Sequence, residues 1–307
     1  MKVLITGGTG FIGLRLIKEL KSQGHEVLGL TRNIEQAQRK DTDVIWIPWK
    51  SHNEIIDFTP YGKIDAIINL VGENLANKRW SNEQKKVIYN SRVEATRNLC
   101  KSIKESQGKI DTFISTSAIG IYGNRRNEEI HEKSLIVDDF VGSLCRDWEE
   151  AVTSNSDIYN RSVIIRVGLV LGKNGGMMEK LLPLFNLGLG GKLSHGNQYM
   201  SWIHLDDICR IFIKALNDHK MQGVYNGTAP FPVTNKEFTN TLGRTIRKST
   251  FFSVPRFALK VVMGEMAEHV LSGAKIIPKR LKEDNFHFLF PTVEVAIKDV
   301  VSKEKSS

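Results

Sequence analysis

The amino-acid sequence predicts an α/β fold, in which a doubly wound parallel sheet is joined to a smaller, mainly helical C-terminal lobe. Three observations support this prediction. Strand-like and helical segments alternate from the first residues, the strand-like segments are nearly continuous apolar runs, and the sequence becomes glycine-rich after about residue 171. Strands of a parallel sheet have this apolar pattern because helices bury both of their faces.

The first β-α-β unit spans residues 2–30. Residues 2–6 (KVLIT) are a short apolar strand, glycines follow, and residues 11–22 carry apolar side chains at helical spacing. Gly24 is placed to end this helix, and residues 25–30 (HEVLGL) are a second strand-like run. A strand, a glycine turn, a helix and a strand in about thirty residues indicate a Rossmann-like sheet.

The rest of the chain extends this sheet and then departs from it. Further strands are expected at 44–47, 65–71, 111–116 and 162–167, and helices at 82–106, 142–153 and 206–217. We expect a nucleotide-binding domain at 1–170. Residues 171–307 are expected to form a substrate or cap lobe with a C-terminal extension, which can also contribute strands to the sheet.

Composition excludes several classes of protein. The chain has 307 residues, 41% of them hydrophobic, which is typical of a globular domain and not of a disordered chain. Cys100, Cys145 and Cys209 are odd in number and widely spaced, so neither a disulfide framework nor a metal site is expected. Neither a signal peptide nor a membrane-spanning run is visible, so we expect a cytoplasmic protein with no membrane partner.

The net charge of +9 is the one unusual figure. It invites a nucleic-acid interpretation, but the basic residues are scattered and no block of five or six occurs. A solvated basic surface, or an anionic ligand, is therefore favoured over a nucleic-acid partner.

Gly7, Gly10 and Gly13 form a GxxGxxG motif between the first strand and the first helix. Small residues let the backbone approach a pyrophosphate at a helix N-terminus, where unpaired N–H groups favour negative charge. The motif therefore predicts a dinucleotide site, with Thr9, Phe11 and Ile12 completing the loop.

The end of the second strand favours NADP over NAD. NAD sites usually place an acidic residue there to hold the ribose, whereas this chain has Thr31 followed by Arg32. A guanidinium is suited to a 2′-phosphate. The alternative is an arginine that merely ends a strand at the surface.

With GGTGFIG at 7–13, NLVGEN at 69–74 and STSAIGIYG at 115–123, the chain resembles the extended short-chain dehydrogenase/reductase superfamily. The segments 78–96, 166–178, 187–207, 223–238 and 276–281 narrow this to its atypical "epimerase family" branch, over essentially the whole chain. The resemblance implies that Leu70, Val71 and Gly72 line the cofactor and that residues 115–117, with Ser115 and Ser117, face its nicotinamide. Arg92 replaces an asparagine of many members and is expected either to reach the cofactor or to lie on a solvated helix face.

The proton-donating pair of the superfamily, Y-x-x-x-K, is missing. None of the six tyrosines is followed four residues later by lysine, and Val141 and Cys145 stand at the expected positions. Ser117, Tyr122 and Cys145 are the candidate groups for handling a proton in place of that pair. Each also has a structural interpretation, which for Cys145 is a small buried apolar residue.

The second lobe contains a glycine-rich segment followed by polar and aromatic residues, His195, Gln198, Trp202 and His204. It suits a substrate wall or lid. For His204 and Asp206 the alternative is a structural brace, with Asp206 as the N-cap of the helix at 207–217.

Two functions follow from this sequence. The first is an NADP(H)-binding oxidoreductase or epimerase that acts on an unidentified small polar substrate, with a homodimer as a possible assembly. The second is a non-catalytic NADP(H)-binding sensor or regulatory protein. A nucleic-acid-binding role is the weakest hypothesis.

Overall fold

The computed structural model describes residues 1–50 and 53–302 of the chain. By its internal contacts the chain forms two compact units. Unit 1 comprises residues 1–121, 138–166 and 209–225, and unit 2 comprises residues 122–137, 167–208 and 226–307. The expected division into domains 1–170 and 171–307 stays a prediction. In the units defined by contacts, residues 122–137 pack with the C-terminal part and residues 209–225 return to unit 1, which agrees with the expectation that the later part of the chain can contribute strands to the sheet.

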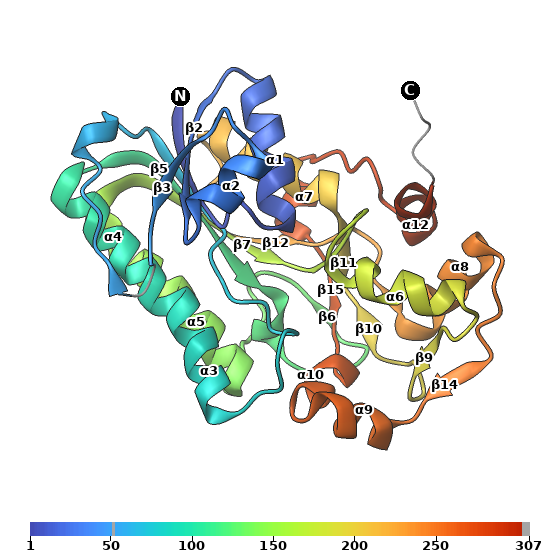
Figure 1. Ribbon diagram of the computed structural model, residues 1–307. Helices are drawn as coiled ribbons and strands as arrows, with labels where there is room; N and C mark the ends of the chain where they lie inside the picture. The colour runs from blue at the N-terminus through green and yellow to red at the C-terminus, as the bar shows by residue number, and fades with distance from the viewer. Residues whose placement is uncertain (51–52, 303–307) are drawn as a thin grey trace. The chain divides into compact units, whose positions relative to one another are not determined.

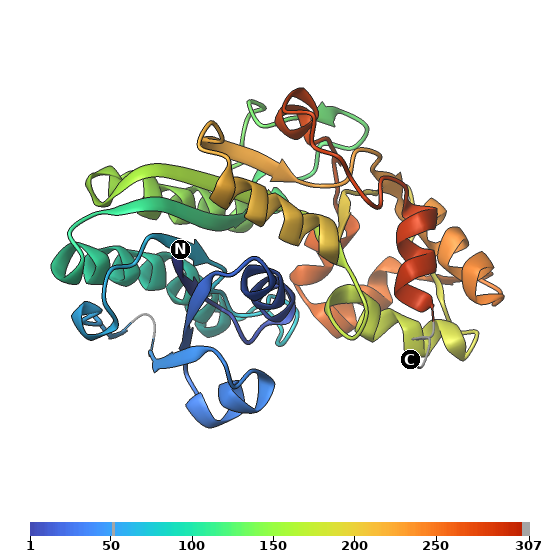
Figure 2. The same cartoon turned by 90° about the horizontal axis from the view of Figure 1, so that it is seen from above.

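Unit 1 is built on a seven-stranded sheet with the order β12-β7-β5-β4-β1-β2-β3, which Figure 2 shows from gold β12 to blue β3. Strands β1 to β5 pair in parallel, which confirms the predicted fold class. The strand bounds are β1 Lys2–Thr6, β2 Glu26–Thr31, β3 Ile45–Pro48, β4 Ala66–Asn69, β5 Ile110–Ala118, β7 Tyr159–Val167 and β12 Gly223–Gly227.

Helices cover both faces of this sheet. Along β1, Leu4 packs in a buried cluster with Leu99 and Ile103 of α4, whereas its neighbours Val3 and Ile5 are buried on the opposite face. Figure 1 shows α3, α4 and α5 grouped beside the sheet. The helical bounds are α1 Phe11–Ser22, α2 Ile34–Lys40, η2 Thr59–Tyr61, α3 Asn82–Tyr89, η3 Asn90–Glu94, α4 Ala95–Ser106, η4 Ile119–Tyr122, α5 Phe140–Thr153, η5 Ser156–Ile158 and α7 Leu205–Asn217.

One long helix of the prediction is divided. The expected helix at 82–106 consists of α3 and α4 separated by η3, a single π-helical turn. No Gly or Pro marks this turn, so the hydrophobic pattern gave no sign of it.

Unit 2 combines helices with two-stranded ladders around its own core. Trp202, Phe238 and Ile297 belong to that buried core. Its strands are β6 Glu129–Ile130, β8 Leu169–Leu171, β9 Gly191–Leu193, β10 Tyr199–Met200, β11 Trp202–His204, β13 Val233–Thr234, β14 Phe252–Val254 and β15 Lys275–Ile276. Its other helices are α6 Gly176–Asn186, α8 Asn235–Ile246, α9 Arg256–Met263, α10 Met266–Leu271, α11 Lys279–Glu283 and α12 Val293–Val301.

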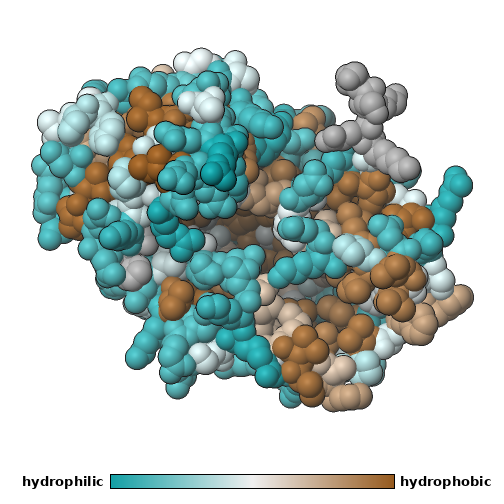
Figure 3. Space-filling model, in the orientation of Figure 1, coloured by the Kyte–Doolittle hydropathy of each residue, from teal (hydrophilic) through white to brown (hydrophobic). Residues whose placement is uncertain are grey.

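Helix α9 carries exposed apolar side chains, Phe257, Val261 and Val262. Figure 3 shows brown atoms over the place that α9 occupies in Figure 1. Among the described residues, no helix is both long and apolar enough to cross a membrane.

Candidate cofactor and catalytic site

The glycine loop between β1 and α1 is closely packed on itself. The Gly10 amide donates to the Gly7 carbonyl at 3.0 Å, and Gly7 has φ +65°, a conformation that favours glycine. A Cβ atom at Gly13 would lie 2.4 Å from the Gly7 oxygen. The helix begins after Gly10 without a side-chain cap, so its first N–H groups remain available to an anion.

The loop therefore fits the diphosphate of a dinucleotide. The fit depends on the missing side chains, because a Cβ atom at Gly13 would force the loop apart. Thr9, Phe11 and Ile12 are half-buried within the same stretch, and their role in cofactor binding stays a prediction.

Two basic side chains lie near the end of β2 and the glycine loop. Thr31 is buried at the end of the strand and Arg32 is exposed directly after it. Lys40, at the end of α2, donates through Nζ to the Thr9 carbonyl at 2.7 Å. Sequence reasoning missed Lys40, whose only signal was a basic residue near the end of a short helix.

The segment after β4 is fixed against β1. The Thr6 hydroxyl oxygen accepts hydrogen bonds from the Leu70 and Val71 amides, each at 3.0 Å. A Cβ atom at Gly7 would lie 2.7 Å from the Leu70 oxygen, so the glycine loop and this segment touch. The structure thus brings together the predicted residues of the first and fourth strands.

A network of buried polar side chains lies at the end of β5. Ser117 donates to Glu149 Oε1 at 2.6 Å. Arg166 donates to the same carboxylate twice, from Nε to Oε1 and from Nη2 to Oε2, both at 2.7 Å. Ser115 Oγ accepts a hydrogen bond from the side-chain amide of Asn69 at 3.2 Å and is buried.

Glu149 and Arg166 were not anticipated. The two side chains are only 12% and 8% exposed, and this two-point contact is the strongest form of arginine–carboxylate pairing. Glu149 lies two turns after Val141 and one turn after Cys145 on α5, so all three share a helix face. The spacing i, i+4, i+8 from the missing tyrosine position was the signal that could have found it.

Cys145 is buried beside this network. Burial raises the pKa of its thiol to about 12, and the negative charge of Glu149 adds to that effect, while Arg92, the Ala118 backbone and Ser117 oppose it. At neutral pH the sulfur therefore stays protonated, which argues against Cys145 as a thiolate nucleophile. Its predicted role in proton handling is not otherwise tested.

The structure assigns the predicted residues to two groups. Apart from Tyr122, every predicted cofactor and catalytic residue lies in unit 1. Tyr122 belongs to unit 2, where it is fully buried and its hydroxyl donates to Asn226 Oδ1 at 2.8 Å.

The expected lid in the second lobe is partly wrong. Trp202 is fully buried and donates through Nε1 to the Phe231 carbonyl, and His204 is 3% exposed. Both belong to β11, which pairs with β8, so they are packed inside unit 2. His195 is exposed and Gln198 is half-buried, and both line the smaller cavity described below.

The predicted N-cap at Asp206 is also wrong. Helix α7 begins at Leu205, and it is the His204 Nδ1 atom that accepts the Asp206 amide at 3.1 Å. Burial lowers the pKa of His204 although three carboxylates nearby oppose this shift. A neutral imidazole has the free lone pair that a cap requires.

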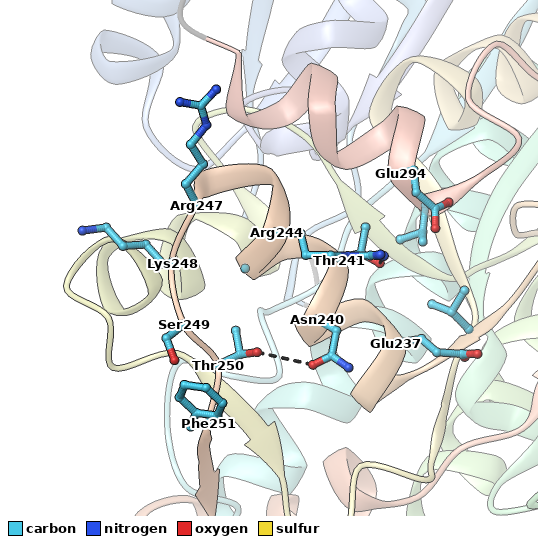
Figure 4. Close-up of a pocket in the computed structure, with 13 residues that line it drawn as sticks. Glu237, Asn240, Thr241, Arg244, Arg247, Lys248, Ser249, Thr250, Phe251 and Glu294 are labelled. Carbon is cyan, nitrogen blue, oxygen red and sulfur yellow. Dashed lines mark hydrogen bonds between the residues drawn. The ribbon is translucent and has the colours of Figure 1, made fainter.

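Cavities of two sizes can be described in unit 2 from the residues that the structure places. The larger, about 690 Å³, lies between α8 and residues 247–251. In Figure 4 the side chains of Arg247 and Lys248 point away from the Asn240–Thr250 hydrogen bond, so the cations do not converge. The smaller, about 320 Å³, is lined by polar groups that include Arg126 and His195.

The sequence profile of the NAD dependent epimerase/dehydratase family matches residues 3–226, and a domain of unknown function, DUF1731, matches residues 254–300. The chain is 36% identical to the chloroplastic epimerase family protein SDR39U1 homolog of Arabidopsis thaliana, over 98% of this chain and 87% of that one. It is 35% identical to an epimerase family protein of Mycobacterium leprae, over 96% and 94% of the two chains.

A solved structure shows the same fold. The human epimerase family protein SDR39U1, crystallised with NADPH, superposes with a TM-score of 0.87 at 32% identity and covers 98% of this chain and 99% of its own. This agreement confirms the Rossmann-like fold and the predicted family.

Proposed function

The chain belongs to the NAD-dependent epimerase/dehydratase family, and from this premise we propose that it is an NADP(H)-binding oxidoreductase or epimerase that acts on a small polar molecule. The observation that carries the proposal is the glycine loop, which fits a diphosphate only because Gly7 and Gly13 lack side chains. The human relative crystallised with NADPH supports the choice of cofactor.

Arg32 favours NADP(H) within this proposal. No acidic residue ends β2, and Arg32 is exposed directly after this strand. Lys40 contacts the glycine loop at the Thr9 carbonyl. A guanidinium at this position suits a 2′-phosphate, and the neighbouring residues Thr31 and Asn33 are uncharged.

When bound, the nicotinamide would supply or take up a hydride, which leaves the protein to orient the substrate and move one proton. The Ser117 hydroxyl donates its proton to Glu149, so its oxygen lone pairs are free to accept. We propose that a substrate hydroxyl gives its proton to Ser117 Oγ while the proton of Ser117 passes to Glu149 Oε1. Arg166 holds the carboxylate in place for this transfer.

The test of cofactor choice is a nucleotide titration. Arg32→Asp is expected to weaken NADPH binding about tenfold or more relative to NADH, because a carboxylate repels the 2′-phosphate. Arg39→Asp, an exposed arginine on α2, makes the same charge change and serves as the control. Equal affinity of the unaltered protein for NADPH and NADH would contradict the phosphate argument.

Catalysis is tested separately. NADPH oxidation is measured against sugars, ketones and quinones, and Ser117→Ala is expected to abolish any turnover found while leaving NADPH binding intact. Failure of every compound would favour the second candidate function, a sensor that binds NADP(H) without turnover. The observation behind that candidate is that Val141 and the protonated Cys145 replace the usual proton-donating pair.

The remaining expectations belong to this proposal. A cytoplasmic location, a possible homodimer, and the lack of a nucleic-acid or membrane partner stay predictions from the sequence.

A further inference from the structure

Arg92 occupies an unusual backbone position. It is the middle residue of η3, the π-helical turn between α3 and α4. A π-turn inserts one extra residue into a helix and changes the direction of the side chains that follow, and such turns are frequent at functional sites. The π-helical turn therefore affects the direction in which the Arg92 side chain points.

The guanidinium group of Arg92 is held between two parts of unit 1. Nη2 donates to the Glu73 carbonyl at 2.9 Å, and Cζ lies 5.4 Å from the ring centre of Trp148. A Cβ atom at Gly72 would lie 3.0 Å from Cζ. The cation thus lies against the predicted cofactor segment on one side and α5 on the other.

Among the described residues, the hydrogen bonds of the Arg92 guanidinium go to neutral acceptors. Glu149 and Arg166 neutralise each other in the neighbouring pair. Arg92 itself donates to the Glu73 and Ile88 carbonyls and the Ser91 hydroxyl, and makes no ion pair with a carboxylate in the part of the chain that the structure describes. Burial lowers its pKa, an effect that Cys145 and Glu73 only partly oppose.

We infer that Arg92 binds an anionic group, a carboxylate or a phosphate, carried by a ligand at this edge of the sheet. The inference rests on the proposed function, since it assigns a chemical class to the substrate of the same site. Two sources of the anion are conceivable, the substrate and the diphosphate of the cofactor.

The surroundings favour the substrate. Arg92 packs over Trp148 of α5, the residue before Glu149, and the Glu149 carboxylate accepts the hydrogen bond of Ser117, the residue predicted to face the nicotinamide. The glycine loop already offers the backbone N–H groups of the α1 N-terminus to the diphosphate. The substrate class is therefore a small organic acid or phosphate ester that carries an oxidisable hydroxyl.

The experiment uses the full-length protein saturated with NADPH. Acetate and inorganic phosphate are the probes, and acetamide is the neutral counterpart of acetate. We expect at least one anion to change the emission of bound NADPH and raise the melting temperature saturably, and acetamide to do neither. Arg92→Gln should abolish the anion effects and leave NADPH affinity within about threefold of the original.

The control is Arg97→Gln, on the exposed surface of α4, where Arg97 pairs with Glu94. This variant should respond to anions as the unaltered protein does. If Arg92→Gln fails to fold, Arg92→Lys is the second variant, because lysine keeps the positive charge but lacks the planar guanidinium fork. It should weaken the anion effects while NADPH still binds, and an unchanged anion response would count against Arg92.

Each outcome decides the inference. Loss of about tenfold or more in NADPH affinity on Arg92→Gln, with no anion effect on the NADPH-loaded protein, would assign the anion to the cofactor and overturn the substrate class. Normal NADPH binding with no anion effect in either protein would overturn the inference and leave the proposed function standing. If the unaltered protein does not bind NADPH, the proposed function fails, and the melting temperatures with the probes alone still test Arg92.

Discussion

The polar network around Ser117 in unit 1 and the large cavity beside α8 in unit 2 use charged residues in opposite ways. In the network, Arg166 and Ser117 converge on one buried carboxylate. In the cavity, Arg247 and Lys248 point outward and leave an open space of about 690 Å³. The volume of a cavity therefore does not by itself identify the candidate catalytic site. Buried polar side chains need hydrogen-bond or ion-pair partners, and the network around Ser117 provides them.

The largest effect is expected at the glycine loop. In Gly13→Ala the new methyl group would meet the Gly7 oxygen at 2.4 Å, so NADPH binding should fall below detection in a fluorescence titration. Gly243→Ala is the matched change beside the unit 2 cavity, where a Cβ atom meets Thr250 at the same 2.4 Å. It should lower the melting temperature without changing NADPH affinity, and loss of NADPH binding there would contradict the distinction between the two regions.

The next effect concerns the buried ion pair. Arg166→Met leaves the Glu149 carboxylate buried without its cation and should lower the free energy of unfolding by about 3–5 kcal/mol, measured by urea denaturation. The exposed Arg146–Asp138 pair provides the comparison, and Arg146→Met should cost about 0–1 kcal/mol. Similar losses in both variants would show that the network has no special stability.

A smaller effect depends on pH. The pKa of Cys145 is raised to about 12 from a usual 9.0, so the thiol stabilises the folded state fully below pH 9 and loses this contribution as pH rises toward 12. Between about pH 9 and pH 12, the Cys145 thiol should reduce the free energy of unfolding by about 1.4 kcal/mol for each pH unit. Urea denaturation from pH 8.5 to 10.5 should show a shallower decline for Cys145→Ala, and an unchanged slope would contradict the burial argument.

The smallest effect is expected in the open cavity. Lys248 is exposed and points away from the Asn240–Thr250 pair, so Lys248→Ala should change the free energy of unfolding by no more than about 0.5 kcal/mol. NADPH affinity should not change. A tenfold change in the affinity for NADPH or for NADH would mean that this region takes part in cofactor binding.

Much of unit 1 follows from local sequence. Strand β1 and helix α1 have the predicted bounds, because their apolar periodicity and the flanking glycines are local signals. The close packing of Gly13 against Gly7 also follows from a local signal, the spacing of the glycines in the loop.

The polar network around Ser117 does not follow in this way. Ser117, Glu149 and Arg166 come from β5, α5 and β7, and only the fold brings them within hydrogen-bonding distance. Likewise, the π-turn at Arg92 leaves no compositional trace, and the amide at the start of α7 is accepted by His204, whose pKa is lowered by burial in the folded protein. Local pattern thus predicts the elements, and tertiary contacts decide the chemistry.

The interleaving of the two units has a consequence for synthesis on the ribosome. The edge strand β12 comes from residues 223–227, whereas its sheet neighbour β7 ends at Val167. At roughly 5–20 residues per second, the growing chain must hold an unfinished sheet edge for several seconds until β12 emerges. During that interval β7 exposes unpaired backbone groups, and an exposed strand edge of this kind can pair with other chains.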